Sequence, residues 1–191
     1  MDIMSINYTY VLAGGGVVLA LYAIRKFNML AALRRRCQRA WADVDVYLRQ
    51  RHDMIPQLAE VVRGLARQEM RVLQAVLDAQ TKALSAASIK ERIEAENMIS
   101  NLLANILPEL NKMPELRSSD EFTRLSEAIM EVEEKLAAAR RFYNLAVDEY
   151  NTALDQFPGM LLRGRAGFRS YRFYSLEAER PVVAERPALN L

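Results

Sequence analysis

The most regular pattern in the chain is a series of apolar positions between Ser119 and Phe157, separated alternately by three and four residues. This spacing places the side chains along one face of an α-helix, whereas a strand repeats every second residue. We therefore predict one long helix over 119–157 whose apolar face packs against other helices. The positions in the series are Phe122, Leu125, Ile129, Val132, Leu136, Ala139, Tyr143, Ala146, Tyr150, Ala153 and Phe157.

Both ends of this predicted helix carry sequence signals. Ser118 stands three residues before Glu121, which is the spacing of a capping box. Pro158 and Gly159 follow the apolar series, and proline cannot continue a helix while glycine accepts a positive φ. We expect the helix to start after Ser118 and to stop at this Pro-Gly pair.

Three further helical patterns precede the long one. The first has an apolar stripe from Met29 to Leu48 and is expected to end within 52–56, because the residue before a proline resists the α conformation. Asp53 is then a candidate cap for a second helix that covers 58–83. In that second series Glu69 occupies an apolar position, so we expect either a basic partner or a shift of register there.

The third pattern begins at Ser88, a good N-cap residue, and continues to Leu110, where Pro108 is expected to kink or fray the last turn. Short links between the four patterns predict an elongated antiparallel four-helix bundle. Gly and Pro are scarce over this region, as is usual for long helices. The predicted fold class is therefore all-α.

The N-terminal segment from Ile3 to Ile24 has no charged residue. Its length of about 22 residues is enough to cross a bilayer as a helix. No Lys or Arg precedes it and no clear small-x-small pattern follows it, so a retained transmembrane anchor is favoured over a cleaved signal peptide. All basic residues come after Ile24, which by the positive-inside rule puts the N-terminus outside and the rest in the cytoplasm. We predict an anchor at 1–26, a helical bundle at 27–168 and a C-terminal tail at 169–191.

Three short patterns of small, polar or aromatic residues have ready structural explanations. Gly16 and Ala20 make a small-xxx-small pair that would suit helix–helix association, although glycine is also simply common in membrane helices. Asn144 and Asn151 flank the long apolar series one heptad apart and are interpreted as interhelical hydrogen bonders. Aromatic residues at helical spacing are expected in the core rather than around a ligand; they are Trp41, Tyr47, Phe142, Tyr143 and Tyr150.

Three groups of residues together resemble the LemA family. They are AWADVDV at 40–46 with RHDMIPQL at 51–58, ARRFYN at 139–144 with the Tyr-Asn-Thr that begins at Tyr150, and the stretch from Phe157 to Phe168. The residues of these motifs to which we assign a structural role are Trp41, Asp45, His52, Asp53, Pro56, Arg140, Arg141, Tyr143, Asn144, Tyr150, Asn151, Phe157 and Pro158.

The resemblance implies a single-pass bacterial membrane protein with its N-terminus outside and a helical bundle in the cytoplasm. The biochemical role of the family is not established, and some relatives are linked to the formation of an internal membrane compartment, the magnetosome. This chain departs from the family pattern at Gln68-Glu69, where a His-Glu pair is usual, and at Val132-Glu133-Glu134, where Thr-Glu-Asn is usual.

The chain offers few residues for catalysis or metal binding. His52 is the single histidine and is interpreted as a turn residue bonded to Asp53 or to a helix end. Cys37, the single cysteine, falls on an apolar stripe and is expected to be buried. The acidic group Glu131, Glu133 and Glu134 lacks the histidines of a di-iron site, so we expect a solvated face or partners for Lys135 and nearby arginines. We predict a protein without catalytic residues, metal or cofactor.

Two basic groups lie near the two ends of the predicted bundle. The first follows the anchor, and the second is interleaved with aromatic residues, a composition that suits an RNA surface or a membrane interface. Four antiparallel helices would return the second group to the membrane, where each charge gains about 1 kcal/mol from anionic lipid. We therefore favour lipid over nucleic acid. The candidate lipid contacts are Arg25, Lys26, Arg34, Arg35, Arg36, Arg163, Arg165 and Arg169.

These observations favour a membrane-anchored, non-enzymatic scaffold or adaptor whose partners are the lipid bilayer and other membrane or cytoplasmic proteins. Two alternatives remain open: a protein that organises an internal membrane, and a homo-oligomeric assembly module. Nucleic acid is not among the predicted partners.

Overall fold

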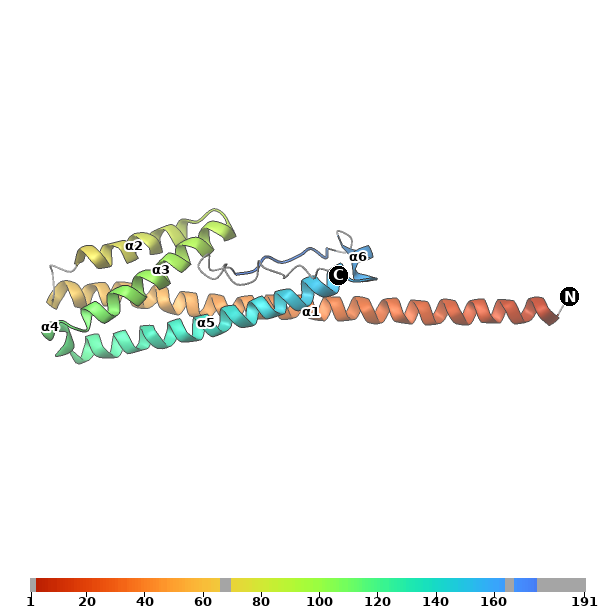
Figure 1. Cartoon of the computed structure of the whole chain (residues 1–191), viewed down its shortest axis with the longest axis horizontal. Coiled ribbons are helices and arrows are strands. Elements are labelled where there is room, and N and C mark those ends of the chain that lie inside the picture. Colours follow the sequence, from red (N-terminus) through yellow and green to blue (C-terminus); the bar gives the residue numbers. More distant parts are fainter. Residues whose placement is uncertain (1–2, 66–69, 164–166, 175–191) are drawn as a thin grey trace, which may run out of the picture. The chain divides into compact units, whose positions relative to one another are not determined.

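The computed structural model describes residues 3–65, 70–163 and 167–174, and side chains from residue 14 onward except those of residues 71 and 72. Nearly all of these residues are helical (Figure 1). The helices are α1 (Ile3–Leu65), α2 (Met70–Ser85), α3 (Ile89–Leu110), α4 (Pro114–Arg117), α5 (Asp120–Asp155) and α6 (Gly159–Leu162). The described residues divide into two compact units, one drawn from the ranges 3–41 and 142–173, and one drawn from the range 42–141 together with Tyr174.

The second unit is an antiparallel four-helix bundle, as predicted, built from the C-terminal part of α1, from α2 and α3, and from the N-terminal part of α5. Neighbouring helices are tied by polar contacts: Gln80 on α2 reaches His52 on α1, and Asn111 on α3 reaches Ser126 on α5. Figure 1 shows α2 and α3 side by side. The core between the helices contains Ile55, Leu58, Val62, Leu73, Val76, Ile99, Leu103, Ile106, Phe122 and Ile129, among others.

The first unit contains the N-terminal part of α1, the C-terminal part of α5, α6 and the segment 167–173. Here α1 and α5 are antiparallel, because Cys37 contacts Ala146 while Trp41 packs against Tyr143, with ring centroids 5.2 Å apart. Cys37 is fully buried, as predicted. Its Sγ donates a hydrogen bond of 3.1 Å to the Ala146 carbonyl, and burial raises the pKa of the thiol.

The prediction that the first helix ends within 52–56 is wrong, because α1 continues through Pro56 to Leu65. The buried positions on α1 keep their three- and four-residue spacing through this region, so burying them favours a continuous helix over a turn. They are Leu48, Arg51, Ile55, Leu58 and Val62. Asp53 accordingly lies inside the helix and caps nothing; its carbonyl accepts a hydrogen bond of 2.9 Å from Gln57.

Pro56 is accommodated because Gln80 supplies a missing donor. Proline has no N–H, so the carbonyl of residue 52 loses its usual partner four residues along the helix. The side-chain amide of Gln80, which is buried, donates a hydrogen bond of 2.9 Å to this His52 carbonyl. The ring of Pro56 itself lies on the exposed face of α1.

The start of α3 is as predicted, whereas the start of α5 is one residue later than predicted. Ser88 caps α3, with its hydroxyl accepting a hydrogen bond from the Glu91 N–H. In α5 it is Ser119, rather than Ser118, that accepts from a backbone N–H, that of Phe122 over 3.2 Å. Pro114 begins the extra turn α4, and the Ser118 hydroxyl donates to the Glu115 carbonyl within that turn.

The long helix ends at Asp155, so Phe157 is not on its packed face but is 69% exposed. The helix stops before the Pro158-Gly159 pair, and among the described residues the glycine with a positive φ, of 74°, is Gly167 and not Gly159. Gly159 is instead required by a close approach of backbone segments, because a Cβ atom there would collide with the carbonyl oxygen of Ala153.

Candidate functional site

A buried polar cluster occupies the core of the second unit. We define it as Arg51 and His52 on α1, Glu96 and Ser100 on α3, and Glu133 and Arg140 on α5. Arg51 and Glu96 have relative exposures of 0% and 1%. Ionised groups this deeply buried require partners, since an unpaired buried charge costs several kcal/mol.

Arg51 is at the centre of the cluster. Its guanidinium is ion-paired with the carboxylate of Glu96 and with that of Glu133, the latter over 2.7 Å. It also donates to the Ser100 hydroxyl over 2.7 Å. The α1 residue Arg51 therefore binds side chains of both α3 and α5, which fixes the alignment of these three helices.

His52 and Arg92 complete the surroundings of Glu96. The Nε2 atom of His52 lies 3.0 Å and 3.1 Å from the two Glu96 carboxylate oxygens, and Arg92 approaches the same carboxylate at 3.8 Å. Burial raises the pKa of Glu96, but the hydrogen bond from His52 and the charge of Arg51 outweigh it. The net pKa lies below the ordinary value, so Glu96 is a carboxylate at neutral pH.

The prediction that His52 is a turn histidine bonded to Asp53 or to a helix end is therefore wrong. His52 lies inside α1 and its ring contacts Glu96 on a different helix. Asp53, the adjacent motif residue, is exposed. The reason is the continuation of α1 through Pro56, which turns His52 toward the bundle instead of leaving it in a loop.

Arg140 borders the cluster on the α5 side. Its guanidinium carbon lies 4.6 Å from the centre of the Tyr174 ring, and one nitrogen is 3.4 Å from Ser100. Burial lowers the pKa of Arg140 and raises that of Tyr174. A guanidinium stacked on an aromatic ring stabilises both partners, so Arg140 holds the Tyr174 ring in place within the second unit.

The acidic residues near the long apolar series divide into two groups. Glu133 binds buried Arg51, while Glu131 pairs with Lys135 over 2.6 Å on the exposed surface. Both contacts fit the expectation that these carboxylates serve as partners for Lys135 and nearby arginines. Glu134 is exposed.

The remaining motif residues have structural positions. Asp45 on α1 is ion-paired with Arg49 and Arg92, and these partners outweigh the effect of its partial burial, so its pKa is lowered. Arg141 is exposed. The prediction that Asn151 forms a hydrogen bond to another helix is wrong. Its side-chain NH₂ donates to the Tyr171 carbonyl, and its side-chain oxygen accepts from the Tyr171 N–H. Asn151 therefore holds the non-helical residue Tyr171 against α5.

The aromatic motif residues are mostly packed in the first unit. Tyr143 and Tyr150 are buried, and the Tyr143 hydroxyl donates to the Arg172 carbonyl over 2.9 Å. Burial raises the pKa of Tyr143 to about 12. Trp41 and Asn144 are half-buried, whereas Phe142 is exposed and lies beside the Arg36 guanidinium. The core prediction therefore holds for Tyr143 and Tyr150 but not for Phe142.

Glu96, Arg51 and Ser100 are the members of the cluster to which no role was assigned from the sequence. A signal for Glu96 was present, because it lies in the helical series Ile93, Glu96, Ile99 and Leu103, in which its neighbours are apolar. Arg51 likewise lies between Leu48 and Ile55 in a buried series. A charged residue at a core position predicts a buried ion pair, although not which partner it has.

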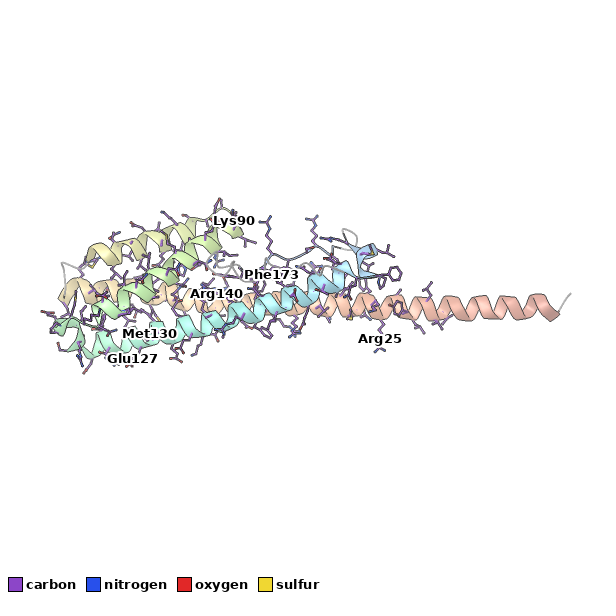
Figure 2. All side chains as sticks on the ribbon, viewed as in Figure 1. Arg25, Lys90, Glu127, Met130, Arg140 and Phe173 are labelled. Carbon is purple, nitrogen blue, oxygen red and sulfur yellow. The ribbon has the colours of Figure 1, made fainter. Side chains whose placement is uncertain are left out.

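The structure brings both predicted basic groups into the first unit, where Gly167 lies beside the Arg34 side chain and Phe168 packs edge-on against Phe27. Arg25, which is labelled in Figure 2, is exposed, as are Arg35 and Arg169. Lys26 is half-buried and lies over the Tyr22 ring.

Two other members of these groups already have acidic partners. Arg36 is ion-paired with Glu149, and Arg163 with Asp155. Arg165 lies outside the described residues, as do Gln68 and Glu69. Lipid contact by these groups remains a prediction, and the exposed side chains of Arg25, Arg35 and Arg169 are the ones most available for it.

Helix α1 is long and apolar enough near the N-terminus to cross a membrane, with a mean hydropathy of 1.5 over its most apolar window. Only 6% of that window is buried within the described structure. Among the described residues, no group of three or more His, Cys, Asp and Glu side chains is arranged to hold a metal ion.

A membrane-associated helical protein is the class that the fold and the apolar helix define. The pattern of the LemA family matches residues 40–188, which is most of the chain. This chain belongs to the LemA family.

Two curated relatives have a weaker similarity. They are magnetosome proteins MamQ 1 and MamQ 2 of Paramagnetospirillum magneticum, each 24% identical to this chain over 85 residues. The match covers 44% of this chain and 31% of each relative, so the chain spans about a third of the length of the curated relatives it matches.

Proposed function

We propose that this protein is a membrane-anchored, non-enzymatic scaffold with its N-terminus outside and its helical bundle in the cytoplasm. The observation that carries the proposal is that α1 holds both the apolar segment and buried core residues such as Leu48 and Leu58 in one unbroken helix. Anchor and bundle therefore share one helix, and a bundle whose first helix is also its anchor is tethered to the membrane.

The charge distribution supports the proposed orientation. The exposed basic residues Arg25, Arg35 and Arg39 follow the apolar segment within a few turns. Positive charge next to a membrane helix favours the cytoplasmic side and is attracted to anionic lipid there. We therefore propose that these residues hold the base of the protein on the lipid headgroups.

The use of the buried polar residues supports a non-enzymatic role. The charge of Arg51 is paired with the carboxylates of Glu96 and Glu133, which lie on other helices of the same bundle. Such a network fixes the alignment of helices and leaves the exposed surface of the bundle for recognition. We propose that this surface binds another membrane or cytoplasmic protein and not nucleic acid.

The orientation is tested by labelling a single cysteine from one side of the membrane. Met130 is 51% exposed on α5, so Met130→Cys provides a reactive thiol, while native Cys37 is fully buried and provides the silent background. A membrane-impermeant maleimide should label Met130→Cys in inside-out vesicles and leave it unlabelled in right-side-out cells. The opposite pattern would overturn the orientation.

The scaffold role is tested by photo-crosslinking in native membranes. A photoreactive amino acid is placed at Met130 or at Met98, both exposed in the second unit, and at Val18 as a control within the apolar segment. A reproducible set of protein adducts from Met130 or Met98, and absent from Val18, is the expected result. Adducts between copies of this chain alone would indicate homo-oligomeric assembly in place of a scaffold for other proteins.

The similarity to MamQ favours one second candidate, a protein that organises an internal membrane. The matching relatives carry the name of magnetosome proteins. Under this alternative, deleting the chain changes membrane morphology seen by electron cryotomography, and Arg34→Gln with Arg35→Gln and Arg36→Gln reproduces the change. Unaltered membranes together with protein crosslinks would favour the scaffold.

A further inference from the structure

Three large apolar side chains lie on the surface around α6. Phe157, Met160 and Leu161 are 69%, 56% and 58% exposed, within five consecutive residues. Single exposed apolar residues are ordinary, but a contiguous group of them marks a contact with a partner or a membrane. We name Phe157, Met160 and Leu161 the α6 apolar group.

The α6 apolar group adjoins a groove that α6 forms with α1. The groove has a volume of about 410 Å³, and Figure 1 shows α6 beside α1. Its lining is apolar apart from Lys26, and consists of Ala23, Ile24, Lys26, Phe27, Pro158, Leu161 and Leu162.

The position of the groove along α1 determines whether lipid or water surrounds it. Ala23 and Ile24 are the last two residues of the uncharged segment, and Arg25 is the first charged residue after it. A helix that crosses the bilayer through this segment leaves the hydrocarbon near Ile24. Under the proposed topology, the groove and the α6 apolar group therefore lie where acyl chains meet headgroups.

The exposure of this group is built into the fold. Gly159 lies so close to the Ala153 carbonyl that no side chain fits between α6 and the end of α5. The Met160 N–H donates to the Gln156 carbonyl and the Leu161 N–H to the Pro158 carbonyl, so these two backbone donors are satisfied within the turn. A turn with its N–H groups bonded enters an apolar medium more readily than an open loop does.

The charges around the groove are those that suit an anionic membrane surface. Lys26 lines the groove, and Arg25 lies between the groove residues Ile24 and Lys26 on α1. Arg163, which is ion-paired with Asp155, follows α6 directly. An apolar group flanked by basic residues is the composition of segments that lie in the membrane interface.

We propose that α6 and Phe157 form an interfacial wedge that inserts into the cytoplasmic leaflet, with lipid acyl chains filling the groove between α6 and α1. The wedge gives the protein a second membrane contact that is distant from the anchor in sequence. This inference rests on the proposed function, because it requires α1 to cross the bilayer through the apolar segment.

A lipid occupant is favoured over a protein by continuity with the apolar segment. Two of the groove residues, Ala23 and Ile24, belong to the stretch that the bilayer already covers under the proposed topology. A protein bound there would have to displace lipid from both. The oxygen and nickel accessibilities described below distinguish these occupants.

The test measures immersion depth with nitroxide labels on the full chain reconstituted into vesicles of three parts phosphatidylcholine to one part phosphatidylglycerol. Leu161→Cys carries the label at the proposed wedge, and Val18→Cys carries it within the apolar segment. Leu145→Cys, on α5 of the same unit and 61% exposed, is the matched surface control. Native Cys37 is fully buried, so labelling of the unsubstituted chain gives the background.

Power-saturation EPR compares the accessibility of each label to oxygen, which concentrates in lipid, with that to a water-soluble nickel chelate. The labels at 161 and 18 should both favour oxygen, and the label at 145 should favour nickel by several-fold. Met160→Cys should follow 161, because both side chains are exposed on the same turn.

Three results would overturn the wedge. A label at 161 as accessible to nickel as the label at 145 places α6 in water, and low accessibility to both reagents places it under protein. In either case, a label at 18 in lipid leaves the proposed anchoring intact. A label at 18 in water overturns the anchoring and the wedge together. Circular dichroism of each labelled variant confirms that the helical fold is retained.

Discussion

The side-chain amide of Gln80 donates a hydrogen bond of 2.9 Å to the backbone carbonyl of His52, the carbonyl that Pro56 leaves without its helical donor. A polar side chain on α2 thus compensates for a proline inside α1. This contact explains how α1 passes from the apolar segment into the bundle core without ending at the proline.

Replacing Gln80 by Met should destabilise the protein by about 1–3 kcal/mol, because a buried carbonyl is left without a partner. Adding Pro56→Ala should recover much of this loss, since an alanine at position 56 supplies a backbone N–H to the same carbonyl. Thermal unfolding in mild detergent, followed by circular dichroism, measures each variant of this double-mutant cycle.

Gln74→Met is the matched control, because Gln74 lies on the same helix and bonds to the exposed side chain of Asp78. It should change stability by less than about 0.5 kcal/mol. If Pro56→Ala changes the stability by the same amount in the unsubstituted chain and in the Gln80→Met variant, the two residues are not coupled. Gln80 then does not compensate for Pro56.

Removing Arg51 should have a larger effect. Arg51→Met leaves the carboxylates of Glu96 and Glu133 without their buried partner and should cost about 3–5 kcal/mol. The double variant Arg51→Met with Glu96→Met should be less destabilised than Arg51→Met alone, because the buried Glu96 carboxylate that lost its Arg51 partner is also removed. Chemical denaturation in detergent compares the two.

Arg141→Met provides the control for the loss of an arginine, since Arg141 is an exposed neighbour of Arg140 on α5. A cost within about 0.5 kcal/mol is expected there. Equal losses of stability in Arg51→Met and in Arg141→Met would contradict the structural role assigned to the buried cluster.

The buried cluster also predicts a dependence of stability on pH. The folded pKa of Glu96 lies below its ordinary value of 4.5, with Arg51, His52 and Arg92 against the carboxylate. Its contribution is therefore complete above pH 4.5 and is lost as the pH falls through the lower, folded pKa.

The comparison that isolates this carboxylate is the difference in melting temperature between the unsubstituted chain and Glu96→Gln. The difference should be constant near neutral pH and should shrink below pH 4.5. If the difference in melting temperature instead widens as the pH falls, folding raises the pKa of Glu96, which contradicts the lowered pKa.

Two Gly→Ala substitutions should have effects of opposite sign. Gly159→Ala places a methyl group against the Ala153 carbonyl and should destabilise the protein by about 1–3 kcal/mol through overpacking. Gly64→Ala lies on α1, where the new Cβ would contact none of the described residues beyond the backbone of its own helix, and should stabilise the protein by about 0.4–1 kcal/mol.

Melting temperatures of the two variants, measured under the same conditions, check this prediction. Amide hydrogen exchange of residues 156–162 should also increase in Gly159→Ala, since α6 must move away from the end of α5. Unchanged exchange together with an unchanged melting temperature would mean that the close approach is absent.

Helix content, the apolar segment and most packed faces were predictable from the sequence. The spacing of apolar residues in α5 identifies the buried side because burial repeats with the helical period, and Ile129 and Tyr150 are buried as that spacing predicts. The Ser88 cap was likewise visible, since it depends only on residues three apart. Local periodicity and local hydrogen bonds are sufficient for these features.

The tertiary structure alone decided where α1 ends and what the polar residues bind. The local rule for Pro56 predicts a break, but burial of Ile55 and Leu58 and the donor from Gln80 favour continuation. The pairing of Arg51 with Glu96 and Glu133 depends on helices far apart in sequence, so no local pattern contains it. The physical reason is that hydrogen bonds and ion pairs between helices form only once packing has brought their partners together.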